Sequence, residues 1–169
     1  MFMLETERLI ITEFTPDMAA AVHANSLDED TRRFVPDEVF ETVEAAADTV
    51  AFLISCYGGS EGPFVYPVLL KSRENIGYVQ AVPMDDGWEI GYHIASPYTR
   101  HGYASEALSA FLPAVMEKLG IRRVKGVCLA DNAASRRVME KCGFTLLSEG
   151  SGLYQGAVRD ICTYCFCAP

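Results

Sequence analysis

The stretch from residue 88 to residue 130 constrains the fold most, because it reads as strand, glycine-containing loop, helix and strand in succession. Residues 88–95 (WEIGYHIA) alternate like a strand, and residues 103–119 place apolar side chains at helical spacing. Residues 122–130 (RRVKGVCLA) are strand-like again. A strand, a helix and a second strand form a right-handed crossover, so these two strands are expected to be parallel.

The flanking segments extend this sheet. Residues 64–70, 76–83 and 88–95, separated by turns at SREN and MDDG, predict a three-stranded antiparallel meander. The remaining expected elements are a strand at 8–14, a helix from Pro16 to about Asn25 with Thr15 as its cap, an irregular segment at 26–40, a helix at roughly 42–57, a short helix at 133–142, and two closing strands.

The expected order is therefore β-α-α-β-β-β-α-β-α-β-β, a mixed α/β (α+β) fold with one central sheet covered by helices. No repeat, charge block or linker divides the chain, and we expect one domain over residues 1–169. Pro113 lies inside the 103–119 helix, removes one backbone donor there, and predicts a kink.

Charge and composition narrow the function. Fourteen basic against 23 acidic residues give a net charge of −9, which disfavours nucleic-acid binding and favours cationic small molecules or basic peptides. No run of 18 apolar residues predicts a membrane span. The first residues, MFMLETERLI, lack the pattern of a secretion signal, so a cytoplasmic location is expected.

Three of the six cysteines cluster near the end of the chain, at Cys162, Cys165 and Cys167. Cys165 and Cys167 share one face of the expected last strand, and no second ligand pair or nearby His stands at metal-site spacing. We favour buried structural thiols over a metal site, and expect no metal.

The richest chemistry lies where strand 88–95 runs through SPYTRHGY into the next helix. The first N–H groups of a helix have no partner within it, so that end of the helix favours an anion such as a pyrophosphate. Gly102 lets the backbone turn tightly, Arg100 and His101 add positive character, and Ser105 offers a hydroxyl. An ordinary strand-to-helix turn is the alternative, because one glycine is a weak motif.

Three segments carry a family resemblance: LETERLIITEFTPDM, WEIGYHIASPYTRHGYASEAL and DNAASRRVMEKCGF. In this order and spacing the chain resembles the GNAT superfamily of N-acyltransferases, and within it the branch of ribosomal-protein N-terminal acetyltransferases. The resemblance covers nearly the whole chain. The sequence departs from the family loop at Thr99, where Gln or Arg is usual, and Arg100 stands where many members have Gly.

The resemblance implies an acetyl-CoA-dependent enzyme that acetylates an amine, as a monomer or homodimer. The expected coenzyme A contacts are the loop with the following first helical turn, free backbone groups at the end of strand 88–95, and a pair in the DNAAS segment. These are Ile94, Ala95, Thr99, Arg100, His101, Gly102, Tyr103, Ala104, Ser105, Asn132 and Ser135. The resemblance also implies that strand 88–95 splays from its parallel neighbour, that Glu89 is a base acting through water, and that Ser135 is the proton donor near the thiol.

The residues themselves leave alternatives open. Glu89 and His93 share one face of the strand, roughly 13 Å apart, and His93 has the intrinsic pKa closer to neutrality. Asn132 can be a plain helix cap and Ser135 a surface hydroxyl. A catalytically silent acyl-CoA-binding module of the same fold, or a nucleotide-binding α/β protein using the Gly102 loop, would also fit some features, although no Walker or G-x-G-x-x-G motif is present.

Overall fold

Eight strands form one mixed sheet in the computed structural model, which describes residues 1–169. The order across the sheet is β1-β2-β3-β4-β5-β6-β8-β7, and only the β5–β6 pair is parallel. The strands are β1 (Leu4–Glu5), β2 (Leu9–Ile11), β3 (Phe64–Leu70), β4 (Asn75–Met84), β5 (Gly87–Ile94), β6 (Arg123–Leu129), β7 (Thr145–Tyr154) and β8 (Ala157–Cys167). The predicted mixed, mostly antiparallel sheet is confirmed.

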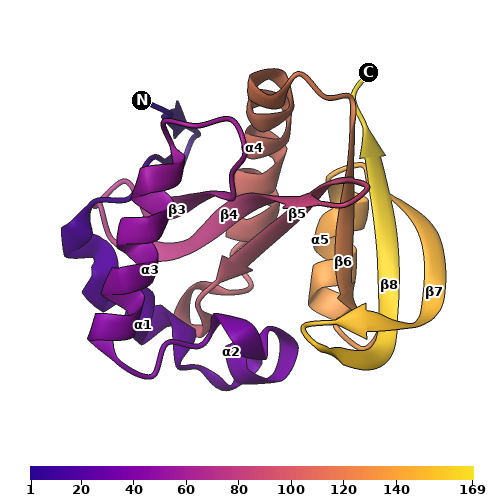
Figure 1. The fold of residues 1–169 in the computed structure, drawn as a ribbon, viewed down its shortest axis with the longest axis horizontal. Coiled ribbons are helices and arrows are strands. Elements are labelled where there is room, and N and C mark those ends of the chain that lie inside the picture. Colours follow the sequence, from indigo (N-terminus) through magenta and orange to yellow (C-terminus); the bar gives the residue numbers. More distant parts are fainter.

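Helices cover both faces of this sheet (Figure 1). They are α1 (Ala19–Ser26), α2 (Glu29–Phe34), α3 (Val43–Cys56), α4 (Tyr103–Leu119) and α5 (Ala133–Lys141). Short 3₁₀ turns lie at Pro16–Met18, Pro36–Glu38 and Ser96–Tyr98. No helix is long and apolar enough to cross a membrane.

Three expectations near the N-terminus were wrong. The strand expected over 8–14 is limited to Leu9–Ile11, the residues that are in register with β3. The segment expected to be irregular at 26–40 contains α2, whose N-terminus is capped by Asp28 through a 2.7 Å bond from the Thr31 N–H to Oδ1. Thr15 makes no side-chain cap at the first helix, which begins as a 3₁₀ turn.

The main hydrophobic core lies between helices α4 and α5 and strands β2–β6 and β8. Helix α4 buries one stripe of side chains at helical spacing: Ala107, Leu108, Phe111, Leu112 and Val115. Burial of each large side chain contributes roughly 1.5–3 kcal/mol. The helix continues through Pro113, which lies on its exposed face, and ends at Gly120 in the left-handed conformation.

A second, smaller cluster packs α1 and α3 against the opposite face of β3, through Phe14, Val50, Leu53 and Val65. The strands β3–β5 thus carry helices on both sides, whereas β6, β8 and β7 form a second part of the sheet toward the C-terminus (Figure 1). The site described below lies where these two parts separate.

Candidate active site

The loop between β5 and α4 presents a row of unpaired backbone donors. Gly102 and Arg100 adopt positive φ angles of 80° and 65°, which turn the chain into the first turn of α4. The bonds from Thr99 N–H to Ser96 and from Glu106 N–H to Gly102 bracket this segment, and the N–H groups of residues 100–105 donate to no acceptor within the chain. Such an array at a helix N-terminus is suited to binding a phosphate or diphosphate.

Arg8, which sequence reasoning missed, holds this loop against β2. Its Nη1 donates to the His101 carbonyl at 2.8 Å, and its Nε donates to Glu106 of α4 at 2.7 Å. The Thr6 hydroxyl donates to the same Glu106 carboxylate at 2.6 Å. The guanidinium also stacks over the Tyr103 ring at 4.6 Å. This network links the start of β2 to the first turn of α4 and fixes the direction of the free amides.

The side chains of the loop are engaged differently from the sequence expectation. The Ser105 hydroxyl is buried and donates to the Gly102 carbonyl at 3.2 Å, so it is engaged within the loop, and a contact of Ser105 with coenzyme A stays a prediction. The Thr99 hydroxyl donates to Ser96 at 2.9 Å. His101 Nδ1 lies 2.8 Å from the Thr99 carbonyl, and its ring stacks on Tyr103. Main-chain donors, together with the exposed Arg100, therefore dominate this surface.

The two parallel strands stay together for only a short distance. β5 and β6 pair at Glu89↔Lys125 and Ile90↔Gly126, and no register pair follows although both strands continue. Beyond Ile90, the edge of β5 that faces β6 is therefore open, which is the expected splay. Ala95 does not offer the free groups expected of it, because its N–H donates to Ile76 at 2.9 Å and its carbonyl accepts from Tyr98 at 2.9 Å.

A cavity of about 240 Å³ occupies the gap between the diverging strands. Its walls include both sequence-predicted catalytic residues, Glu89 and Ser135, together with Asn132. Burial raises the pKa of Glu89; Lys125, which pairs with it in the sheet, opposes that shift, and Asp86 adds to it. Glu89 thus lines the same cavity as Asn132 and Ser135, although both lie more than forty positions later in the sequence.

Ser135 has a hydroxyl partner that sequence reasoning missed. The Tyr92 hydroxyl lies 2.7 Å from Ser135 Oγ and donates to the Ser135 carbonyl at 2.9 Å. Burial raises the pKa of Tyr92, so its phenol stays protonated across the neutral range. Asn132 caps α5 by accepting the Ser135 N–H at 3.1 Å. Two neighbouring hydroxyl groups therefore line the cavity, that of Ser135 from the first turn of α5 and that of Tyr92 from β5.

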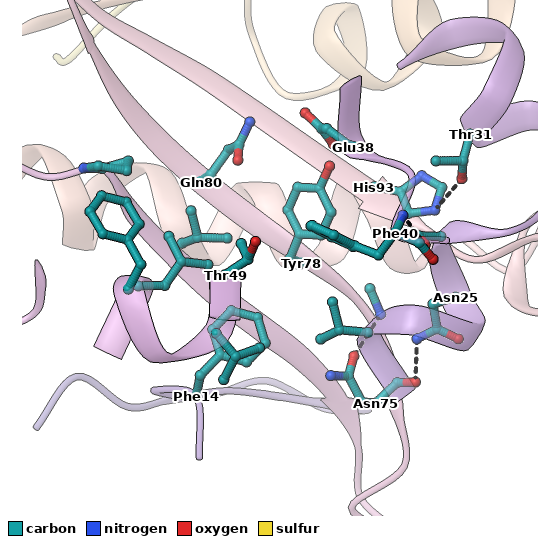
Figure 2. Close-up of a pocket in the computed structure, with 18 of the residues that line it drawn as sticks. Phe14, Asn25, Thr31, Glu38, Phe40, Thr49, Asn75, Tyr78, Gln80 and His93 are labelled. Carbon is teal, nitrogen blue, oxygen red and sulfur yellow. Dashed lines mark hydrogen bonds between the residues drawn. The ribbon is translucent and has the colours of Figure 1, made fainter. Parts of the chain in front are cut away.

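His93 lies in a different cavity, of about 340 Å³, between β3–β5 and the helices α1 and α3. Its Nε2 contacts the Thr31 hydroxyl at 3.1 Å, as Figure 2 shows, and Asp28 Oδ2 at 4.0 Å. Burial lowers the pKa of His93, against the attraction of Asp28 and Asp30. Glu89 and His93 share a strand face as expected, but each opens to a separate cavity.

Glu38 is a further acidic residue that sequence reasoning missed, and it lines both cavities. Its Oε2 is buried and has no hydrogen-bond partner. Burial raises the pKa of Glu38 to about 7; Gln80 opposes the shift, and Asp37 and Glu89 add to it. Glu38 lies in the segment that sequence reasoning took as irregular, where no periodic signal marked it.

The terminal cysteines pack as single thiols. Cys165 and Cys167 share a face, with their sulfur atoms 3.9 Å apart, and Arg123 Nε donates to Cys165 at 3.0 Å. All six cysteines are free, Cys162 is fully buried, and no group of three or more potential metal ligands occurs.

Comparison with known proteins identifies the family. The profile of the Acetyltransferase (GNAT) domain matches residues 8–145. The chain belongs to this family. The uncharacterized N-acetyltransferases YoaA and YnaD of Bacillus subtilis are each 30% identical to it, over 84% and 83% of this chain and 82% and 81% of theirs.

Solved structures share the fold along almost the full length. A GNAT-family acetyltransferase from Bacillus anthracis superimposes with a TM-score of 0.83 at 26% identity, covering 98% of each chain. RimL, described as a ribosomal L7/L12 alpha-N-protein acetyltransferase in complex with coenzyme A, superimposes with a TM-score of 0.85 at 20% identity, covering 99% of this chain and 98% of that one. This GNAT chain is therefore an acetyltransferase, as the sequence motifs predicted.

Proposed function

We propose that this GNAT acetyltransferase uses acetyl-CoA to acetylate a primary amine directly, without a covalent enzyme intermediate. The acceptor is a small-molecule amine or a protein N-terminal α-amine. One observation carries the proposal: Glu89 of β5 and Ser135 of α5 line the same cavity in the gap between the diverging strands. Two proteins of similar structure support the choice of acyl donor, since RimL was solved in complex with coenzyme A and the immunity acetyltransferase MccE in complex with acetyl-CoA.

The N–H groups of residues 100–105 are suited to the diphosphate of coenzyme A, because they are unpaired and lie at the positive end of α4. The open edge of β5 beyond Ile90, including Ile94, offers backbone groups to the amide-containing pantetheine arm. Asn132 lies at the far end of this path, on the wall of the cavity. We assign these residues to binding the donor; the observed free amides and open strand edge fit it.

Acetyl transfer forms a C–N bond to the amine and breaks the C–S bond of the thioester, so one proton must leave the nitrogen and one must reach the sulfur. We assign the first proton to Glu89, through water, because its raised pKa brings a carboxylate closer to neutrality. We assign the second to the Ser135 hydroxyl, which lies 2.7 Å from the Tyr92 hydroxyl; the serine oxygen then recovers a proton through Tyr92, and water restores the tyrosine. His93 is separated from this cavity and is not needed for either step.

The test is an acetyl-CoA consumption assay against a mixed library of amines and peptides, with the parent protein, Glu89→Gln and Ser135→Ala. Loss of a general base lowers kcat by roughly 10²–10⁴-fold, and we expect Glu89→Gln to do so while acetyl-CoA binding by calorimetry is retained. Asp85→Asn, an exposed carboxylate in the β4–β5 turn, is the matched control. Binding of acetyl-CoA without turnover of any amine would instead indicate a silent binding module.

The single domain over residues 1–169, the cytoplasmic location and the monomeric or homodimeric state remain predictions from the sequence.

A further inference from the structure

The two cavities meet at one acidic side chain. Glu38 and Gln80 line both the cavity in the strand gap and the larger cavity between the sheet and helices α1 and α3. Glu89 and Ser135, which we place at the reacting groups, line the first cavity, so Glu38 stands where an acceptor in the second cavity would meet the acetyl group. The position of Glu38 thus suits contact with the nucleophilic nitrogen.

The carboxylate of Glu38 has an unused acceptor. Its Oε2 is buried without a hydrogen-bond partner, which is a costly state for a carboxylate unless a donor arrives from a ligand. No Lys or Arg lines either cavity. A ligand that carries its own positive charge would supply both the missing hydrogen bond and the missing counter-ion.

The walls and volume of the larger cavity indicate the polarity and size of the rest of the ligand. They are mainly apolar and aromatic, with Phe14 from the segment that follows β2 and Tyr78 from β4, and Thr49 enters from α3 (Figure 2). Most of the polar groups in the wall are committed: Asn25 donates to the Asn75 carbonyl, and Thr31 contacts His93. A volume of about 340 Å³ is near the lower end of the range for small-molecule pockets, roughly 300–1,000 Å³.

We infer that Glu38 binds the ammonium group of the acceptor, and that the acceptor is a primary amine on a compact apolar body that fills this larger cavity. The inference rests on the proposed N-acetyltransferase function and specifies its acceptor. Glu38 acts by binding and orienting the nitrogen. The ammonium gives up one proton through water to Glu89 and from there to solvent, which frees the lone pair that attacks the thioester. The second proton leaves the nitrogen as the C–N bond forms and balances the proton that the departing sulfur receives. The mainly apolar lining selects against bodies that carry a carboxylate, because that charge would be buried beside Glu38 and Asp37. It also selects against long polycations, because these two carboxylates are neighbours in the sequence and the rest of the lining has no acidic residue to pair with distant charges.

Steady-state kinetics with four amines test the acceptor class: 2-phenylethylamine, phenylalanine, spermidine and a serine-initiated tetrapeptide. We expect kcat/KM for 2-phenylethylamine to exceed each of the others by at least about tenfold. A preference for spermidine or for the tetrapeptide would overturn the inference and leave the proposed function intact. Acetyl-CoA binding without turnover of any amine would overturn the proposed function itself.

Glu38→Gln tests the anchor. We expect KM for 2-phenylethylamine to rise at least about tenfold, with a smaller change in kcat and no change in the affinity for acetyl-CoA. Asp48→Asn, which removes an exposed charge from α3, is the control and should change neither constant. An unchanged KM in Glu38→Gln, or an equal rise in Asp48→Asn, would overturn the assignment.

A second variant keeps the inference testable if Glu38→Gln fails to fold. Thr49→Phe places a bulky side chain into the larger cavity from α3. We expect it to raise KM for 2-phenylethylamine at least about tenfold while leaving that for ethylamine within about threefold. Equal effects on the two amines would show that the apolar body lies elsewhere.

Discussion

The buried carboxylate of Glu38 gives the fold a pH-dependent weakness that a single isosteric substitution removes. Glu38→Gln keeps the shape of the side chain and abolishes its ionisation. The pKa of Glu38 is raised from 4.5 to about 7, mainly by burial. At about 1.4 kcal/mol per pH unit, this shift corresponds to about 3 kcal/mol.

The direction in which stability changes with pH depends on whether the folded or the unfolded chain binds the Glu38 proton more tightly. The folded chain binds this proton more strongly than the unfolded chain, so the free energy of unfolding of the parent falls as the pH rises from 4.5 to about 7. The groups that face Glu38, namely Asp37, Glu89 and Tyr154, with His93 in the same cavity, are present in both proteins, so a difference between parent and variant isolates Glu38.

Thermal unfolding followed by circular dichroism from pH 4 to pH 8.5 measures this difference. At roughly 2–4 °C per kcal/mol for a chain of this size, Glu38→Gln should match the parent at pH 4 and exceed its Tm by up to about 10 °C at pH 8. Asp48→Asn should follow the parent throughout. Parallel curves for parent and Glu38→Gln, or a variant that is less stable at pH 8, would show that ionisation of Glu38 does not destabilise the fold.

Three further predictions follow from other contacts. Ser135→Ala and Tyr92→Phe should each lower kcat by about tenfold, because one hydroxyl remains. The double variant should lose roughly 10³–10⁴-fold, and a double loss of only about 100-fold, the product of the single losses, would contradict a shared donor role. Gly102→Ala should weaken acetyl-CoA binding, measured by calorimetry, by roughly 5–30-fold, since an L-residue in the left-handed conformation costs about 1–2 kcal/mol. Gly120→Ala introduces the same strain at the other end of α4 and should leave this binding unchanged. Gly77→Ala should lower the free energy of unfolding by at least about 2 kcal/mol in urea titrations, because its Cβ would lie 1.9 Å from the His93 carbonyl oxygen; a smaller loss would show that β4 and β5 can separate there.

Local patterns sufficed for much of the fold. The strand at residues 64–70 was predicted with its observed bounds, because alternation and the flanking turns are properties of neighbouring residues. The tight turn at Gly102 was likewise predicted from the loop, and its φ of 80° confirms it. β1 escaped prediction because two residues carry no period.

The site depended more on contacts that no local pattern encodes. Arg8 and Glu106 are 98 positions apart, and Tyr92 and Ser135 are 43 apart, so neither pair is visible before the chain folds. Glu38 sits in a 3₁₀ turn whose neighbours show no periodicity, and its importance comes from burial between two cavities. The roles of Glu89 and Ser135 came from the family resemblance, and the structure adds that both open to one cavity.

¹⁵N–¹H NMR during a titration with coenzyme A shows whether the free amides of residues 100–105 bind the diphosphate of the acyl donor. The largest amide shift changes should occur at residues 100–105, and acetyl-pantetheine, which lacks the diphosphate, should not reproduce them. Saturable binding of coenzyme A that leaves those six amides unmoved, or the same shifts with acetyl-pantetheine, would mean that the diphosphate binds elsewhere.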